Sequence, residues 1–282
     1  MKNVILTVFV GVLAAACVPD APAPHLGLAF PCTWPTSPGF APTADIDRTS
    51  IGEPSGLIYH PFRKTLFVIS DQGEIFEIRT DGEPVGRWPV PGDLEGLTVD
   101  PGTGLLYVVI EGEDVVLEFD PERGAVLRRF PISRAFGGDP EFLRRSTPYD
   151  NGIESIAFVP DPGHPEGGAF YAGNQEDPSC LLELIVPLKS GGEAGGPARI
   201  VRVLKTELQD PAGMYYDERS GLLNVVCDAP NIFLEVRLDG TVVRAYAFPG
   251  NDQEGVCVDP EGFIYIAQDS GGILKLKDLR PR

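Results

Sequence analysis

Residues 93–130 read DLEGLTVDPGTGLLYVVIEGEDVVLEFDPERGAVLRRF. The stretch holds four short runs rich in Val, Leu, Tyr and Phe, and Asp, Gly or Pro separates each run from the next. Branched and aromatic side chains favour strands, whereas Gly, Pro and Asp favour the tight turns between strands. The stretch therefore predicts four antiparallel strands joined by short turns.

The same unit recurs along the chain, and a small residue marks the first strand of every copy. The markers are Gly56, Gly96, Ser155, Gly213 and Gly255, spaced by 40, 59, 58 and 42 residues. A repeat of about 40–45 residues with four strands is typical of a β-propeller blade, whose sheet is covered by its neighbours. We therefore predict an all-β chain that forms a five-bladed β-propeller of four-stranded antiparallel blades over residues 43–282. Six blades are the alternative, but the longer spacings hold too little strand-like sequence for a hidden unit.

The last unit supplies only three strands before the chain ends. Closing the ring removes exposed sheet edges, so a strand from elsewhere should complete this blade. Residues 44–50 precede the first unit and are expected to supply it.

The chain carries 41 acidic against 23 basic side chains, a formal net charge of -18. Nucleic-acid binding requires a basic surface, and this balance excludes it. The sequence also contains no Gly-x-Ser-x-Gly, His-Glu-x-x-His or dinucleotide-binding motif. Any hydrolysis would have to be assisted by a metal ion, with a carboxylate such as Glu95 or Glu154 accepting the proton.

The first 42 residues are expected to direct and anchor the chain rather than to fold. Residues 1–16 have the charged start and short apolar run of a lipoprotein signal peptide, and Cys17 follows three alanines, as in a bacterial lipobox. Residues 17–42 would form a lipidated, Pro-rich tether. This predicts a protein of the bacterial cell envelope, lipid-anchored to the membrane and facing the periplasm or the exterior. An ordinary secretory signal with an incidental cysteine is the alternative.

Four further cysteines leave the disulfide pattern open. Cys32, Cys180, Cys227 and Cys257 allow three pairings, and the sequence does not choose between them. Cys227 and Cys257 lie in apolar runs, which favours buried free thiols at these two positions.

Acidic residues recur where the first strand of a blade begins and the second ends, and these two points meet at one mouth of the central tunnel. The three positions concerned in each unit are acidic in eleven of fifteen cases. Crowded carboxylates repel one another, and a bound cation removes that cost. Oxygen ligands suit Ca²⁺, with Mg²⁺ a weaker candidate. The predicted metal ligands are Glu95, Glu154, Glu254, Asp71, Glu111, Asp228 and Asp269. The alternative is that these acids cap turns and keep the mouth soluble without a specific ion.

A second acidic column lies in the third strand of the units. It comprises Glu77, Glu118, Glu183 and Glu235, with Lys275 in the last copy. Because apolar residues flank each position, we expect a structural role between blades, bonding to neighbouring backbone.

The segment 131–150 joins the second blade to the third and is expected to lie over the acidic mouth. Its basic and aromatic residues predict a site for an anionic ligand such as a phosphate, formed by Arg134, Arg144, Arg145 and Tyr149. Alternatively, these arginines pair with acids of the mouth.

The units resemble the SdiA-regulated (YjiK/CarP-like) family of bacterial β-propeller proteins. The resemblance rests on Leu94-Glu95-Gly96-Leu97-Thr98, Gly152-Ile153-Glu154-Ser155-Ile156 and Gln253-Glu254-Gly255-Val256 and covers about residues 43–282. It implies an envelope-associated propeller linked to calcium through Glu95, Glu154 and Glu254, with a phytase-like role. Ser55 and Ala212 depart from the pattern in two blades. The unit is also similar to calcium-dependent lactonase and phytase propellers.

Together these features predict a calcium-binding envelope module whose partner is an anionic small molecule or an envelope protein. A calcium-dependent hydrolase of phosphoesters or lactones is the alternative.

Overall fold

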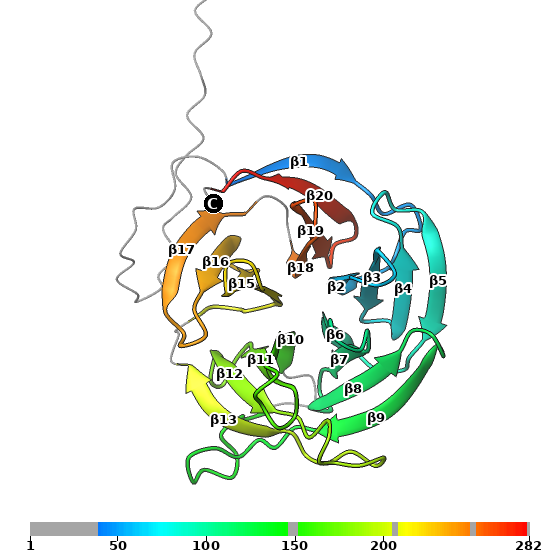
Figure 1. Ribbon diagram of the computed structural model, residues 1–282. Helices are drawn as coiled ribbons and strands as arrows, with labels where there is room; N and C mark the ends of the chain where they lie inside the picture. Colours follow the sequence, from blue (N-terminus) through cyan, green and yellow to red (C-terminus); the bar gives the residue numbers. More distant parts are fainter. Residues whose placement is uncertain (1–38, 146–151, 205–207, 249–251, 281–282) are drawn as a thin grey trace, which may run out of the picture.

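The computed structural model describes residues 39–145, 152–204, 208–248 and 252–280. Twenty strands form five four-stranded antiparallel sheets around a central axis (Figure 1), and the described residues contain no helix. The all-β, five-bladed β-propeller predicted from the repeats is confirmed. The described residues thus include no helix that is long and apolar enough to cross a membrane.

In the first four blades the strands follow one another in chain order from the axis to the circumference. The first is β2 (Pro54–His60), β3 (Thr65–Ser70), β4 (Glu74–Ile78) and β5 (Pro84–Pro89), and the second is β6 (Leu94–Val99), β7 (Leu106–Ile110), β8 (Val115–Asp120) and β9 (Ala125–Pro131). The third is β10 (Ile153–Pro160), β11 (Gly168–Asn174), β12 (Cys180–Ile185) and β13 (Arg199–Leu204). The fourth is β14 (Gly213–Asp217), β15 (Leu222–Cys227), β16 (Ile232–Val236) and β17 (Val242–Ala247). The fifth is β18 (Gln253–Val258), β19 (Phe263–Gln268) and β20 (Ile273–Asp278), completed by β1 (Phe40–Asp45).

The two ends of the described chain close the ring in one blade. β1 pairs antiparallel with β20, with Phe40 opposite Asp278. The closing strand lies at Phe40–Asp45, a few residues earlier than the stretch 44–50 expected from the sequence. Phe40 is 1% exposed, and its ring lies 5.0 Å from Phe233 and 4.9 Å from Phe248 in the neighbouring blade. Burial of this ring therefore contributes to holding the composite blade in place.

The marker residues of the repeat lie where the inner strands crowd around the axis. A Cβ on Gly213 would lie 2.0 Å from the carbonyl oxygen of Glu254, and one on Gly56 would lie 2.7 Å from that of Glu95. Ser155 occupies the equivalent position in the third blade, and its hydroxyl donates a hydrogen bond to the Pro211 carbonyl at 2.6 Å. Backbone contact between adjacent inner strands therefore explains why the markers are small.

The core lies between the blades. Every residue of β3 and β7 is buried, whereas the outer strands β5 and β9 are largely exposed. This explains why the second strand of each unit is almost continuously apolar, while the fourth strand mixes apolar and charged residues. Cys180, Cys227 and Cys257 are buried free thiols within this core. Cys32 lies outside the described residues.

The acids of the third strands are bound by arginines. Glu118 accepts two hydrogen bonds from Arg128 of the same blade, and Arg128 also donates to the Leu188 carbonyl of the next blade at 2.7 Å. Glu183 and Arg202 repeat this arrangement. The expected structural role holds, but the basic partner makes the contact between blades. The other pairs are Glu77 with Arg63, and Glu235 with Arg244 and Arg280.

Candidate metal centre at the tunnel mouth

One backbone hydrogen bond repeats in all five blades and brings the acidic columns together. The residue after the second strand donates its N–H to the carbonyl of the residue three positions before the marker. The pairs are Asp71 with Glu53, Glu111 with Asp93, Gln175 with Gly152, Asp228 with Asp210, and Asp269 with Asp252. The columns recognised in the sequence are therefore neighbours in space.

Local irregularities place the three glutamates at the start of the inner strands. The pairing register shifts between Ile153 and Ser155, so that Glu154 is the extra residue of a β-bulge, and similar shifts surround Glu95 and Glu254. Such bulges redirect a side chain that a regular strand would place elsewhere. Glu95 and Glu254 lie beside the glycine markers at the narrow waist of the tunnel.

The three glutamates form one electrostatic cluster. Glu154 is 7% exposed, and burial, followed by the charges of Glu254 and Asp210, raises its pKa well above the ordinary value. The pKa of Glu95 is raised by burial first and then by Asp71, Glu154 and Glu254. Glu254 behaves in the same way, with burial followed by the charge of Asp228. The mouth therefore gathers carboxyl groups in a poorly solvated place, where burial and the neighbouring acids disfavour their charged form.

A group of three carboxylates that could hold a metal ion includes Asp93, which was not among the predicted ligands. Carboxylate oxygens of Asp71, Asp93 and Glu95 all lie within 4.8 Å of one another. Burial, followed by the charge of Asp93, raises the pKa of Asp71 to about 7. Asp93 lies three residues before its marker, in the acidic column whose members all approach the mouth. That column was the signal that could have identified it.

Several buried oxygens at this mouth lack a hydrogen-bond donor. Among the described residues no partner is found for Oδ1 of Asp71, Oε2 of Glu154, Oε1 of Gln175 or Oδ1 of Asp269. A buried acceptor without a partner costs free energy, because it has lost the water that solvated it. A hard divalent cation would offset this cost, so the donor chemistry of the mouth fits Ca²⁺ or Mg²⁺.

Two of the predicted ligands also cap backbone groups. Glu111 Oε1 accepts from the Gly152 N–H at 2.9 Å, and Asp228 Oδ1 accepts from the Gln253 N–H at 2.8 Å. In these two acids, one carboxylate oxygen therefore caps a backbone N–H. This is the role that the alternative to metal binding assigns to all the acids of the mouth. The pKa of both carboxyls is nevertheless raised, with burial as the largest cause.

The arginines expected to bind an anion are largely occupied. Asp114, in the turn after β7 and 4% exposed, accepts from Arg134 Nε at 2.6 Å and from Arg145 Nη2 at 2.5 Å. Arg144 is exposed, 3.9 Å from Asp139. Arg134 and Arg145 thus pair with an acid, although Asp114 is outside the acidic columns. Tyr149 lies outside the described residues, as does Cys17.

The described part of this segment packs beside the third blade. Ile132 forms a β-bridge with Ala198, the Arg144 N–H donates to the Asp177 carbonyl, and Leu143 is fully buried. Arg145 nevertheless lies close enough to Glu111 for its charge to lower the pKa of that carboxyl against the larger effect of burial. One guanidinium therefore borders the acidic mouth.

Comparison with known proteins gives one family match and a shared fold. Residues 49–179 match a family described as "Phytase-like: Esterase-like activity of phytase". A glutaminyl cyclase from Myxococcus xanthus is similar with a TM-score of 0.55 and 14% identity, over 84% of this chain and 95% of that chain. A gluconolactonase from Xanthomonas campestris gives a TM-score of 0.49 and 16% identity, over 85% and 95%. No curated protein matches the chain. At 14% identity, the similarity to the glutaminyl cyclase shows the propeller fold alone.

Proposed function

We propose that this chain is an envelope-anchored β-propeller lipoprotein that binds Ca²⁺ at the acidic tunnel mouth and serves as a ligand- or protein-binding module. The observation that carries the proposal is a set of buried carboxylate oxygens, on Asp71, Glu154 and Asp269, for which the described part of the chain supplies no hydrogen-bond donor. Such oxygens are costly in a module that binds no cation, and they are what a calcium site requires.

The proposed ligands come from two positions in the blades, the start of the inner strand and the end of the second strand. Glu95, Glu154 and Glu254 project from the inner strands, while Asp71, Glu111, Asp228 and Asp269 follow the second strands. Asp93 joins them through its proximity to Asp71 and Glu95. When bound, the cation would neutralise the mouth and offer a positive centre to an anionic small molecule or to a carboxylate of an envelope protein. Mg²⁺ suits this set less well, because it demands a regular octahedral arrangement.

Calcium titration calorimetry on the purified chain tests the proposal. We expect stoichiometric binding that is lost in the triple variant Glu95→Gln/Glu154→Gln/Glu254→Gln. The matched control is Asp81→Asn/Glu113→Gln/Glu141→Gln, which removes the same charge from exposed sites and should bind as the unaltered chain does. Absence of binding heat together with absence of calcium-dependent stabilisation would exclude the site.

A second function, a calcium-dependent hydrolase of phosphoesters or lactones, is favoured by the phytase-like match. The matched segment 49–179 contains Asp71, Asp93, Glu95, Glu111 and Glu154. A cation at the mouth would polarise a substrate oxygen, while Arg145, which is paired with Asp114, lies beside Glu111. Glu95 or Glu154 would accept the proton if its carboxylate were not bound to the cation, and burial raises the pKa of both carboxyls above the ordinary value.

Assays with a phosphoester and a lactone separate the two functions. Hydrolysis that requires calcium and falls at least about a hundredfold in Glu154→Gln would support the enzyme. Calcium binding without turnover of either substrate would leave the binding module.

The N-terminal motif supports the proposed location and, with the glutamate motifs, membership of the SdiA-regulated family. Cys17→Ser should move the protein from the membrane fraction to the soluble envelope fraction, because it removes the lipidated side chain. Retention of the variant in the membrane fraction would contradict the lipid anchor.

A further inference from the structure

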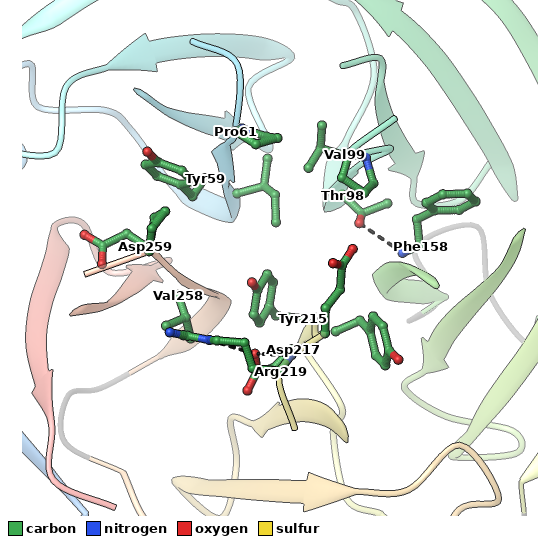
Figure 2. A pocket seen from close by; sticks show the side chains of 15 residues that line it. Tyr59, Pro61, Thr98, Val99, Phe158, Tyr215, Asp217, Arg219, Val258 and Asp259 are labelled. Atoms are coloured by element: carbon green, nitrogen blue, oxygen red, sulfur yellow. Dashed lines mark hydrogen bonds and ion pairs between the residues drawn. The ribbon is translucent and has the colours of Figure 1, made fainter. Parts of the chain in front are cut away.

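A cavity of about 340 Å³ lies at the other mouth of the tunnel, where the inner strands end. Figure 2 shows its lining, with Tyr59, Thr98, Phe158, Tyr215 and Val258 around a central space. These residues belong to β2, β6, β10, β14 and β18, so all five blades contribute. The volume falls within the range of small-molecule sites.

The waist of the tunnel separates this cavity from the acidic mouth. The space among the marker residues and Glu95 and Glu254 measures only about 10 Å³, which leaves no passage for a small molecule. None of the proposed metal ligands lines the cavity. The two mouths are therefore separate sites on one axis.

The sequence repeat accounts for the aromatic lining. Three residues after each marker, the chain carries Tyr59, Val99, Phe158, Tyr216 and Val258. All five line the cavity, and three of them are aromatic. Tyr215, beside this column, adds a fourth aromatic ring. The Phe158 ring is buried, 4.9 Å from the ring of Phe170, so the rings that can offer apolar area and an electron-rich face to a ligand are those of the tyrosines.

Carboxylates dominate the charged groups around the cavity. Asp217, Glu218 and Asp259 line it against a single basic residue, Arg219. Asp259 is satisfied internally, since it accepts from the Phe263 N–H and the Tyr265 hydroxyl, both at 2.9 Å. Glu218 is exposed, and no hydrogen bond or ion pair links it to another described residue. The lip of the cavity therefore carries an unpaired negative charge.

The tyrosines experience this negative charge. The pKa of Tyr59 is raised by burial and then by Asp259, and that of Tyr216 is raised by burial and then by Glu218 and Asp217. An electron-rich ring in a negative potential attracts cations and disfavours anions. The limited number of free carboxylates disfavours a bare metal ion, which needs six or more oxygen ligands as Ca²⁺.

We propose that this cavity binds a small organic cation, an ammonium group attached to an apolar or aromatic body. The apolar body would fill the space between the aromatic rings, and the ammonium would lie against Tyr59 or Tyr216, within reach of Glu218. The proposal goes beyond the calcium site, because it concerns the opposite mouth and does not depend on metal binding.

Ligand titration by calorimetry or ligand-observed NMR tests it, with benzyltrimethylammonium as the probe and phenylacetate and benzyl alcohol as anionic and neutral counterparts. We expect benzyltrimethylammonium to bind more tightly than either counterpart. Its affinity should be unchanged by saturating calcium and by the triple variant Glu95→Gln/Glu154→Gln/Glu254→Gln. Competition by calcium, or loss in that variant, would place the cation at the acidic mouth and overturn the proposal.

Substitutions in the lining supply the second test. Tyr216→Leu and Tyr59→Leu keep apolar volume but remove the ring, and at least one of them should weaken binding by roughly two- to thirtyfold. Phe62→Leu is the matched control, since Phe62 is 60% exposed and does not line the cavity. Glu218→Gln, on the surface, carries no risk to folding and should weaken binding by about twofold at low salt. Equal binding of phenylacetate, no binding of the ammonium, or unchanged affinity in folded Tyr variants would each reject the proposal.

Discussion

The stability of the fold and the proposed metal binding make opposite demands on three residues, Glu95, Glu154 and Glu254. Each is a carboxyl whose pKa is raised chiefly by burial. Among the described residues, none of the three pairs with an arginine as Glu77 and Glu118 do on the outer side of a blade. Carboxylates at this mouth make the folded state less stable at neutral pH. Such a cost is typical of a binding site.

This conflict predicts an unusual pH dependence in the presence of a chelator. A carboxyl with a raised folded pKa, such as Asp71 at about 7, stabilises the fold below its unfolded pKa, and this stability is lost as pH rises through the folded pKa. The melting temperature should therefore fall by at least about 3 °C between about pH 5 and 8. Saturating calcium should flatten the profile, and so should the triple Gln variant without calcium. A melting temperature in chelator that rises with pH would contradict this account.

Asp114 and Glu113 are adjacent acids with opposite environments. Asp114 is 4% exposed and binds Arg134 and Arg145, whereas Glu113 and its partner Arg129 are both about half exposed. Removal of Asp114 would leave Arg145 buried and unpaired. We expect Asp114→Ala to cost about 3 kcal/mol in the free energy of unfolding, and Glu113→Ala about 0.5 kcal/mol or less. Denaturant unfolding measures both, and equal losses would contradict the assignment of Asp114 as the anchor of the segment.

At the scale of the elements, the inner strands are the most constrained part of the fold. They must approach one another closely at the markers and still direct glutamates toward the mouth. The β-bulges at Glu95, Glu154 and Glu254 reconcile the two requirements, because the extra residue breaks the strict alternation of the strand. Each inner strand thus runs from the acidic mouth to the opposite mouth, where the tyrosine-lined cavity lies.

Gly213→Ala tests the close approach. Its Cβ would lie 2.0 Å from the Glu254 carbonyl oxygen, and backbone cannot move aside as a side chain can. We expect a loss of about 3 kcal/mol or a failure to fold. The control Gly196→Ala places its Cβ 3.4 Å from the nearest atom, Pro187 Cγ, and should change stability by about 0.5 kcal/mol or less. Thermal unfolding of the pair decides, and tolerance of Ala at position 213 would reject the close contact.

At the scale of the whole molecule, the ring is held closed by one short strand. β1 is exposed along most of its length, so Phe40 is the side chain that fastens it to the fourth blade. The blade that this strand completes also carries two acids of the mouth, Glu254 in β18 and Asp269 directly after β19.

Phe40→Ala should cost about 3–5 kcal/mol in the free energy of unfolding, the range for large core aromatics. Hydrogen exchange in β20 should increase, because its partner strand would separate more often. Phe62→Ala removes an aromatic ring of equal size that is 60% exposed, and about 1 kcal/mol or less is expected. Similar losses in the two variants would show that closure does not depend on this ring.

Three features of the fold could be predicted from the repeats: the four-stranded blade, the number of blades, and a last blade completed by a strand from before the first unit. Each unit is short, its strands pair with sequence neighbours, and its small markers, apolar second strand and turn residues are local signals. The acidic columns at positions such as Asp71 and Glu95 followed from the same repeat, since equivalent residues in a radial array must meet at one mouth. The closing strand lies a few residues before its predicted position, because it is not part of a repeat unit that would mark its place.

The hydrogen-bond partners of the candidate site residues could not be predicted from the sequence and follow from the tertiary structure. Whether an arginine is available depends on the acid that faces it, and Asp114 belongs to a turn that the repeat does not mark. Likewise, backbone N–H groups donate to one oxygen of Glu111 and of Asp228, whereas oxygens of Asp71, Glu154 and Asp269 have no partner within the described segments. The aromatic cavity emerged in the same way, because five inner strands must converge before Tyr59, Phe158 and Tyr216 can share one space. Hydrogen-bond partners and cavities arise from contacts between blades, and these contacts are not local in the sequence.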